Sequence, residues 1–413
     1  MIRKTTLGEI ANIITGPFGS QLHMSDYVNM GIPVIMPQDI KDGTISLENI
    51  AHISDKDYLR LKRYAINSND IIFARRGDIE KHAFITDSNK LLCGTGCFRV
   101  RITDSSVYPL FLSFYLNRYE TRKWLTSHAV GSNMPNLNTS ILSAVPLDLP
   151  CFNEQVKIGN FLYNIEKKIQ CNNKINNNLQ QMSIATYINM FYGKKSNGKL
   201  VDILIENTKS TVQAGEAKNK SGDFPFFTSG DAVLRWNEHI VDGRNILLNT
   251  GGNAGVKFYV GKAAYSTDTW CITAKSDMED YLYLFLNSIK QELNQKFFQG
   301  TGLKHLQKPL LKERAIYIPL KNEISDFNSY IKPWLSMISD NTRESFRLSA
   351  LRDWLLPMLM NGQVSIMDEQ EGYLKTNNSG FKQWLANQGY AARGDVDIDI
   401  LQDIYEAMDS DDK

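Results

Sequence analysis

The sequence predicts an α+β fold in which two similar globular domains alternate with two long helices. The first observation behind this prediction is an internal repeat: the segment Gly131–Gly193 aligns without a gap with Gly300–Gly362, 169 positions further on. The second observation is that both copies end in a long stretch with apolar residues at helical spacing. Two copies of one unit on one chain imply two similar sites held at a fixed separation.

The repeat holds its register although the identity between the copies is low. The matched pairs include Leu137 with Leu306, Pro150 with Pro319, Asn153-Glu154 with Asn322-Glu323, Asn172 with Asn341, and Leu179 with Leu348. On this basis we divide the chain into a first globular domain (1–150), a first long helix (151–196), a second globular domain (197–320), a second long helix (321–363) and a C-terminal part (364–413).

The composition is that of an ordinary globular protein. The 413 residues are enough for two or three domains that bury their own cores. No apolar run approaches the roughly 20 residues that a membrane span needs, and no charged and then apolar leader is present, so we expect a cytoplasmic protein. Cys93 and Cys97 have no second ligand pair nearby, which favours buried thiols over a metal site.

The net charge of +1 conceals an uneven distribution. The residues after Gly362 contain 4 Lys and Arg against 11 Asp and Glu, which leaves 42 against 34 on the rest of the chain. The body is therefore mildly basic and the C-terminal part acidic. A mildly basic body is compatible with a nucleic-acid partner but does not establish one.

Each globular domain contains short strand signals in the same order. GIPVI (31–35) corresponds to DFPFF (223–227), and NDIIFARRGDIEKHAFI (69–85) corresponds to RNILLNTGGNAGVKFYV (244–260). The runs 111–117 and 281–287 are expected to form buried helices. Because the offsets between matched strands vary, the connecting loops must differ in length, and loops are where recognition usually diversifies on a shared scaffold.

The two long segments are expected to pair as an antiparallel coiled coil. Each would form a helix of about 40 residues, or roughly 60 Å at 1.5 Å per residue, with one narrow apolar seam. The polar run 171–179 interrupts the first seam, and Pro333 should bend the second helix. The alternative is two ordinary bundle helices in a single core. The seam residues are Ile158, Phe161, Leu162, Ile165, Ile169, Leu179 and Met182, and then Ile324, Phe327, Ile331, Trp334, Leu335, Ile338, Leu348, Leu351, Leu355 and Leu359.

The C-terminal part lies outside the repeat. We expect a polar linker over 363–380, followed by two short amphipathic helices with acidic outer faces. These helices would dock on this chain or on a partner, or they would form a small cap that packs on itself. Their apolar residues are Phe381, Trp384, Leu385, Ile398, Leu401, Ile404, Tyr405 and Met408.

Motifs of catalysis are missing or incomplete. No two prolines are adjacent, so the Asp/Asn-Pro-Pro-Tyr/Phe motif of amino-methyltransferases is absent. GGNAGVK (251–257) has the wrong glycine spacing for a phosphate loop, and no Ser or Thr follows Lys257. A nuclease site could be built from Glu216 and Lys218 with Asp202, although hard-cation sites need convergent carboxylates that a sequence does not show. We expect no catalytic residues and no metal ligands in this chain.

The order of these parts resembles the specificity subunit of type I restriction-modification systems. The resemblance covers residues 1 to about 366. It rests on the two strand motifs, on STDTWCI (266–272), on the loops that begin at Gly131 and Gly300, and on LRDWLLPMLMNGQ (351–363). The acidic C-terminal part departs from the family pattern.

The resemblance implies a function for each part. Each globular domain would be a target recognition domain that reads one half of an interrupted double-stranded DNA site. The long helices would set the gap and bind two methyltransferase subunits, which methylate adenine with S-adenosylmethionine. Endonuclease subunits would translocate and cleave with ATP and Mg. In this family the specificity subunit is not itself catalytic and binds none of these cofactors.

Candidate DNA-binding residues lie in the loops and carry groups that suit phosphates or base edges. Arginine can grip phosphate or read guanine, and Asn or Gln suits adenine. The first domain offers Gln38, Arg75, Arg76, Lys81, Ser132, Asn133, Asn136 and Asn138, and the second offers Asn249, Asn253, Lys257, Thr301, Lys304, His305 and Gln307. For each residue alone, the competing interpretation is an ordinary polar side chain in a loop exposed to solvent.

Two other functions compete with DNA recognition. A helical scaffold with protein-binding end domains would share the repeat and the helices but would not bind DNA with the steep salt dependence of a DNA reader. A self-contained restriction enzyme would need catalytic motifs that the sequence lacks.

Overall fold

The computed structural model describes residues 2–41, 43–87, 89–131, 135–218, 220, 222–366 and 374–376. The chain forms two compact units. The first unit combines Met1–Lys167 with Leu348–Lys413, and the second unit is Lys168–Arg347. The two long helices therefore each contribute residues to both units.

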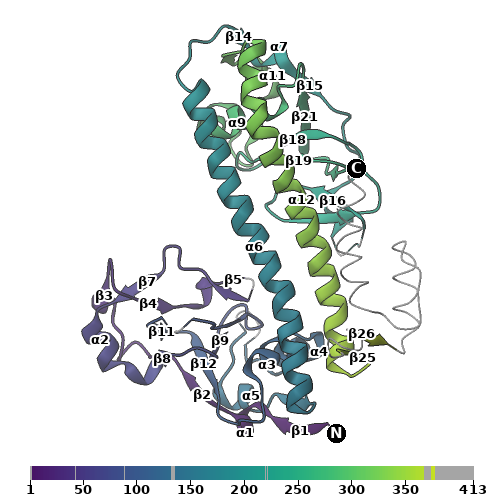
Figure 1. Ribbon diagram of the computed structural model, residues 1–413. Helices are drawn as coiled ribbons and strands as arrows, with labels where there is room; N and C mark the ends of the chain where they lie inside the picture. The colour runs from purple at the N-terminus through teal and green to yellow at the C-terminus, as the bar shows by residue number, and fades with distance from the viewer. Residues whose placement is uncertain are drawn as a thin grey trace. The chain divides into compact units, whose positions relative to one another are not determined.

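The first unit contains two principal sheets (Figure 1). The first is antiparallel throughout, in the order β10-β9-β12-β2, and the second has the order β3-β7-β4-β11-β8 with one parallel pair, β4 and β11. The strands are β2 Ala11–Thr15, β3 Tyr27–Val28, β4 Ile32–Ile35, β7 Ala51–Ile53, β8 Ala65–Ile66, β9 Ile71–Ala74, β10 His82–Phe84, β11 Leu91–Cys93 and β12 Cys97–Ile102.

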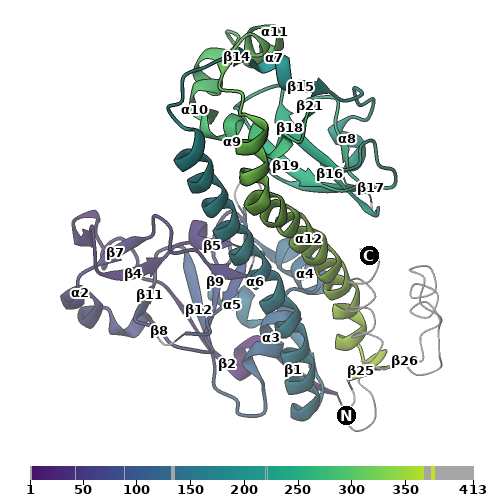
Figure 2. The same cartoon turned by 45° about the horizontal axis from the view of Figure 1, so that its top comes forward.

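The second unit repeats this design with fewer strands (Figure 2). Its antiparallel sheet has the order β15-β21-β18-β19, and its smaller sheet has the order β17-β16-β20, again with one parallel pair, β16 and β20. The strands are β15 Leu204–Glu206, β16 Phe224–Phe227, β17 Val233–Trp236, β18 Arg244–Asn249, β19 Val256–Val260, β20 Ala264–Tyr265 and β21 Thr269–Ala274. The predicted correspondence of strands is confirmed.

The central strands form where the sequence has short apolar runs. All four residues of β9 are buried, as are five of the six residues of β18. Burial on both faces explains why these strands lack the alternation of a half-exposed sheet. Cys93 and Cys97 are buried in the first unit, and burial raises the pKa of the Cys93 thiol to about 12.

One buried helix packs against the antiparallel sheet in each unit. These helices are α3 (Pro109–Leu116) and α9 (Glu279–Ser288), which confirms the predicted buried helices. The Arg244 guanidinium in β18 donates to both carboxylate oxygens of Asp280 in α9, at 2.7 Å each. It also donates to Ser336 Oγ at 3.0 Å, so this arginine joins sheet, buried helix and long helix within the second unit.

The long helices are α6 (Phe152–Phe191) and α12 (Lys321–Met360), with 40 residues each. In the first unit, Ile158 and Leu162 of α6 share a core with Leu355 and Leu359 of α12. In the second unit, the core holds Tyr187 and Phe191 from the end of α6 and Ile324, Phe327 and Ile331 from the start of α12. The helices therefore run antiparallel, as predicted (Figure 1, Figure 2).

The seam of the second unit differs from the prediction in one stretch. Met182, expected on the seam, is 47% exposed, whereas Ser183 is fully buried. The buried stripe moves by one position because Tyr187 and Phe191, at helical spacing from Ser183, supply the apolar contacts here. The helix α12 continues through Pro333 without a break in its helical residues.

Between these apolar ends the seam is polar. Asn172 is 1% exposed, and its Nδ2 donates to Glu344 Oε2 at 2.5 Å and to Ser345 Oγ at 3.3 Å. Asn341 Nδ2 donates to Asn176 Oδ1 at 2.8 Å. The predicted interruption at 171–179 is thus a partly buried layer of hydrogen bonds and not a gap in the pairing.

The chain after α12 begins with strand β25 (Val364–Ile366), which pairs antiparallel with β26 (Leu374–Thr376). The segment 363–380, expected to be a polar linker, thus contains a strand pair, and Val364 is buried in the first core. The predicted short amphipathic helices lie outside the described residues. Within the described part of the chain, no helix has the length and apolarity to cross a membrane.

Candidate nucleic-acid interface

The loop after strand β9 of the first unit is fixed by backbone hydrogen bonds to a distant loop. Leu137 N–H donates to Arg75 O at 3.0 Å, and Gly77 N–H donates to Pro135 O at 3.2 Å. Arg76 and Asn136 lie opposite each other between these bonds. The arginine pair and the loop that begins at Gly131 are therefore held together, although about 60 positions separate them in the sequence.

The second unit contains the same arrangement at equivalent positions. Leu306 N–H donates to Thr250 O and Gly252 N–H donates to Lys304 O, both at 2.9 Å, while Gly251 lies opposite His305. Gly77 and Gly252 have φ angles of +76° and +78°, so both loops turn through a conformation that favours glycine.

A third segment completes each arrangement. Arg75 N–H donates to Gly96 O at 2.7 Å, and Thr250 N–H donates to Asp268 O at 3.1 Å. We call the three joined segments of each unit the paired loops: residues 75–77, 94–96 and 135–138 in the first unit, and residues 250–252, 266–268 and 304–307 in the second.

The paired loops of the first unit present two arginines with different surroundings. Arg75 lies over the Phe18 ring at 5.3 Å, and its Nε donates to Leu137 O at 3.4 Å. Burial and the neighbouring charge of Arg76 lower the pKa of Arg75, which still leaves the guanidinium protonated at neutral pH. Arg76 is exposed and forms no ion pair among the described residues.

The other candidates of the first unit are only partly gathered here. Asn138 caps helix α5 (Thr139–Ser143), since its Oδ1 accepts from Ile141 N–H at 2.8 Å. Gln38 is exposed in a single helical turn, Pro37–Asp39, whose Pro37 lies near Gly96. Lys81 forms an exposed ion pair with Asp78 at 3.1 Å. Ser132 and Asn133 lie outside the described residues.

The candidates of the second unit have equally varied surroundings. Thr301, Lys304 and His305 are exposed on the loop that begins at Gly300, and Gln307 precedes helix α11 (Lys308–Lys312). Lys257 lies in β19, where its Nζ donates to Thr228 O at 2.5 Å and to Gly230 O. Burial lowers the pKa of this ammonium group.

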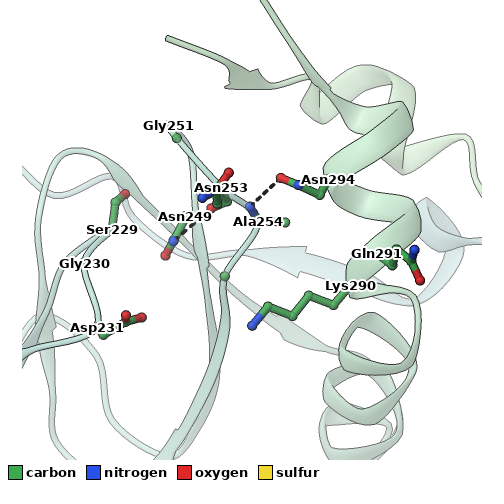
Figure 3. A pocket seen from close by; sticks show the side chains of 12 residues that line it. Ser229, Gly230, Asp231, Asn249, Gly251, Asn253, Ala254, Lys290, Gln291 and Asn294 are labelled. Carbon is green, nitrogen blue, oxygen red and sulfur yellow. Dashed lines mark hydrogen bonds between the residues drawn. The ribbon is translucent and has the colours of Figure 1, made fainter. Parts of the chain in front are cut away.

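Asn249 and Asn253 line an open pocket of about 740 Å³ in the second unit (Figure 3). Three segments form its walls: the turn at 229–231, the loop at 249–255 and the helical residues 290–294. Amide, lysine and carboxylate side chains face this space, including Asn249, Lys290, Asn294 and Asp231. Such donors and acceptors suit a polar ligand and not an apolar one.

Three residues at these sites were missed from the sequence. Phe18 is 51% exposed beside Arg75, and the turn TGPFGS that carries it was a visible signal. Lys290 and Asn294 follow a buried helix, and Asn294 lies in a π-helical turn, Leu293–Phe297, which no sequence pattern indicated. π-helical turns are frequent at functional sites.

The carboxylates of the alternative nuclease site have structural roles. Asp202 Oδ2 accepts from Lys199 N–H at 2.7 Å, and Glu216 Oε1 accepts from Gln213 N–H at 2.9 Å. Each therefore stabilises the start of its own short helix, α7 (Leu200–Ile203) or α8 (Ala214–Ala217). Among the described residues, no group of three or more His, Cys, Asp or Glu side chains is placed to hold a metal ion.

Comparison with known proteins gives consistent matches. The family model described as "Type I restriction modification DNA specificity domain" matches residues 2–181 and again 192–331. The chain is 20% identical over 405 residues to the MjaIX type I restriction enzyme specificity subunit of Methanocaldococcus jannaschii, covering 87% of this chain and 92% of that protein. It is 26% identical over 167 residues to the EcoBI specificity subunit of Escherichia coli, covering 39% of this chain and 35% of that protein.

A solved structure shares the fold. The type I restriction-modification system S subunit from M. genitalium aligns with a TM-score of 0.60 at 13% identity, over 87% of this chain and 96% of that one. Each of the two family matches contains one set of paired loops. The chain therefore belongs to the type I restriction-modification DNA specificity family and is a specificity subunit with two target recognition domains.

Proposed function

We propose that this chain reads a bipartite, interrupted DNA site, with one half recognised by the paired loops of each unit. The observation that carries the proposal is the duplication of the paired loops. The same peptide groups are bonded in both units, while the side chains at matched positions differ: Arg75 corresponds to Thr250, Arg76 to Gly251 and Asn136 to His305. A shared backbone with different side chains suits two readers of different base sequences.

The side chains of each unit fit contacts with DNA. The exposed guanidinium of Arg76 can bind phosphate or read guanine bidentately. In the second unit, the exposed residues Lys304 and His305 lie in the segment of the paired loops that corresponds to 135–138. The basic balance outside the C-terminal part adds attraction to the DNA backbone that does not depend on sequence.

The long helices would set the gap between the half-sites and bind two methyltransferase subunits. This part of the proposal is supported by the two helices of 40 residues each, both of which contribute residues to both units. In this proposal, methyl transfer from S-adenosylmethionine and cleavage driven by ATP with Mg belong to methyltransferase and endonuclease subunits. The chain itself acts in the cytoplasm without a cofactor or a catalytic residue.

Sequencing of methylated adenines tests this proposal. The chain is expressed together with the methyltransferase subunit of its system, either unchanged or as Arg76→Ala. We expect the unchanged complex to methylate a motif of two parts separated by a fixed gap. The Arg76→Ala variant should relax or weaken recognition in one part only, because the second unit is unaltered.

Two outcomes would overturn the proposal. A single continuous motif would exclude two separate readers. Binding to duplex DNA without sequence preference, together with a flat response to salt, would favour a scaffold whose end domains bind proteins, since a DNA reader loses affinity steeply as salt rises. The variant Lys4→Ala is a matched control, because it removes one exposed positive charge from strand β1 (Arg3–Thr6), outside the paired loops.

A further inference from the structure

The pocket of the second unit is lined by two asparagine side chains that bond to the loop 249–255. Each side chain uses one of its two polar groups for this, the amide nitrogen of Asn249 and the amide oxygen of Asn294. Asn249 Nδ2 donates to Asn253 O at 3.1 Å. Asn294 Oδ1 accepts from Ala254 N–H at 3.1 Å (Figure 3). The loop is thus tied to strand β18 at its base and to the π-helical turn at its tip.

The other polar group of each amide forms no hydrogen bond with a described residue. Asn249 is 8% exposed, and its Oδ1 is buried with no hydrogen-bond partner among the described residues. Asn294 Nδ2 likewise has no partner in the described part of the chain, and its side chain lines the same pocket. A buried acceptor without a donor lowers the stability of the folded state, and a donor on a ligand would remove this penalty.

The loop is built to lie closely over Asn249. A Cβ at position 255 would lie only 2.4 Å from Asn249 Nδ2, so Gly255 is needed for the backbone to pass here. By contrast, no atom comes within 4 Å of a Cβ built at Gly252. The loop is therefore open at Gly252 and closely packed at Gly255, and a ligand would reach Asn249 Oδ1 only if the part at Gly255 moved.

The charges around the pocket indicate how a ligand would lie. Lys290 extends from its helix toward the loop, is exposed, and forms no ion pair with any described residue (Figure 3). Asp231 lies on the wall opposite. A phosphate would be attracted to the Lys290 side and repelled from the Asp231 side.

We propose that this pocket recognises an adenine in the half-site read by the second unit, with Asn249 Oδ1 accepting from the N6 amino group and Asn294 Nδ2 donating to N7. The two free groups line one pocket, and an acceptor together with a donor is what the major-groove edge of adenine requires. The exocyclic amino group alone would also suit cytosine, but cytosine lacks the N7 acceptor that Asn294 needs. The proposal rests on the proposed DNA-reading function and adds the base that one unit selects.

The first unit does not offer this pair. In the first unit, the residue equivalent to Asn249 is Ala74. Ala74 pairs with Cys97 of β12, and in the same way Asn249 pairs with Thr269 of β21. Ala74 has no polar side-chain group, and Arg75 and Arg76 follow it directly. The two units would therefore select different bases, with amides in one and guanidinium groups in the other.

Base analogues test the pair without altering the protein. Once the methylated motif is known, the affinity of the specificity subunit with its methyltransferases is measured on duplexes in which each adenine of one half-site is replaced in turn. Purine lacks the N6 amino group and 7-deazaadenine lacks N7. At one adenine of the second unit's half-site we expect each analogue to weaken binding by about tenfold.

The variant Asn294→Asp then assigns N7 to this side chain. Aspartate keeps an oxygen for Ala254 N–H, so the loop stays in place. It replaces the donor by an oxygen and adds one negative charge, which the control variant below adds as well. We expect 7-deazaadenine to cause no further loss with this variant, while purine still does. Gln295→Glu is the matched control, because Gln295 is exposed on the same π-helical turn and does not line the pocket. It should keep the sensitivity to both analogues.

The outcomes separate this proposal from the one on which it rests. If the complex methylates a bipartite motif but no adenine shows both sensitivities, or if Asn294→Asp keeps its sensitivity to 7-deazaadenine, the assignment of the pocket is wrong and the proposed function stands. Sensitivity at a cytosine in place of an adenine also overturns it. If the unchanged complex binds no DNA sequence selectively, the proposed function fails and this inference fails with it.

Discussion

Asn172 and Asn341 occupy equivalent positions of the internal repeat and contact each other in the helix seam, where Asn172 Nδ2 donates to Asn341 O at 3.5 Å. The hydrogen bonds beside them are also equivalent, since Asn172 bonds to Ser345 and Asn341 bonds to Asn176. In an antiparallel pair of repeated helices, equivalent residues meet only where the approximate twofold axis crosses the seam. The polar layer of the seam marks that point.

Replacing Asn172 should destabilise the protein. Asn172→Leu removes the donor that Glu344 and Ser345 share and leaves a carboxylate beside an apolar side chain. We expect the free energy of unfolding to fall by about 1–3 kcal/mol. Chemical denaturation followed by circular dichroism measures it. Asn177→Leu, on the exposed face of the same helix, is the control and should change the value by less than about 0.5 kcal/mol.

The ion pair of Arg244 and Asp280 should show strong coupling. Asp280 is 1% exposed, so Arg244→Met leaves a buried carboxylate without its partner and should cost about 3–5 kcal/mol. The double variant Arg244→Met with Asp280→Leu should recover most of this loss, because neither charge is then buried. A double-mutant cycle of unfolding free energies measures the coupling between the two side chains. Additive losses would show that the two groups act independently.

Two glycines, one in the second unit's paired loops and one just before their last segment, should differ in their tolerance of substitution. Gly252→Ala forces a side chain into a backbone with φ of +78°, which should cost about 1–2 kcal/mol although the space around it is open. Gly302 has open space and no such φ angle, so Gly302→Ala should be nearly neutral. Calorimetric melting of both variants tests the contrast. Equal effects would mean that strain at Gly252 is not what distinguishes them.

Glu323 should make stability depend on pH in acid. Its carboxylate accepts from Lys194 Nζ at 2.5 Å, from Tyr317 Oη at 2.7 Å and from Leu320 N–H at 2.8 Å, and these bonds lower the pKa of Glu323 to about 2. Because the folded pKa lies below the ordinary value of 4.5, the stabilisation is complete above pH 4.5 and is lost as pH falls toward 2.

The variant Glu323→Gln isolates this dependence. We expect the melting temperature of the unchanged protein to fall more steeply than that of the variant between pH 5 and pH 2. Glu154 is the repeat equivalent at the start of α6, is exposed, and has none of these three bonds among the described residues. Glu154→Gln should therefore follow the unchanged protein. A parallel decline in all three proteins would assign the acid sensitivity to other groups.

The fold could be predicted because its main signals are local and repeated. Helical spacing of apolar residues predicted α6 and α12, and short apolar runs predicted the strands at 31–35, 69–85, 223–227 and 244–260 but not their order in the sheets. The error at Met182 has a physical origin, since the apolar contacts of this stretch come from Tyr187 and Phe191, which lie at helical spacing from Ser183 and not from Met182. Only the contacts across the seam decide which of two neighbouring positions is buried.

The candidate site was harder to predict because its contacts are distant in sequence. Asn294 supports the loop at Ala254 from 40 positions away, in a π-helical turn without a sequence signature. Asn138 and Lys257 are polar loop-type residues in the sequence, yet one caps a helix and the other binds carbonyl groups. A Ser, Thr or Asn just before a short apolar helix is a recognisable cap signal, which would have indicated the role of Asn138.

The paired loops have a consequence for how such a protein can change over generations. The bonds that join them use mostly peptide N–H and C=O groups, with the side chains of Arg75 and Thr250 as further donors. None uses the side chain of Arg76, Asn136 or His305, so a substitution there leaves these bonds intact. Single mutations can therefore change the side chains exposed on the paired loops without breaking the hydrogen bonds that hold the loops together. A lineage under pressure to change its preferred sequence would not have to pass through misfolded intermediates, and each half could vary while the other stayed as it was.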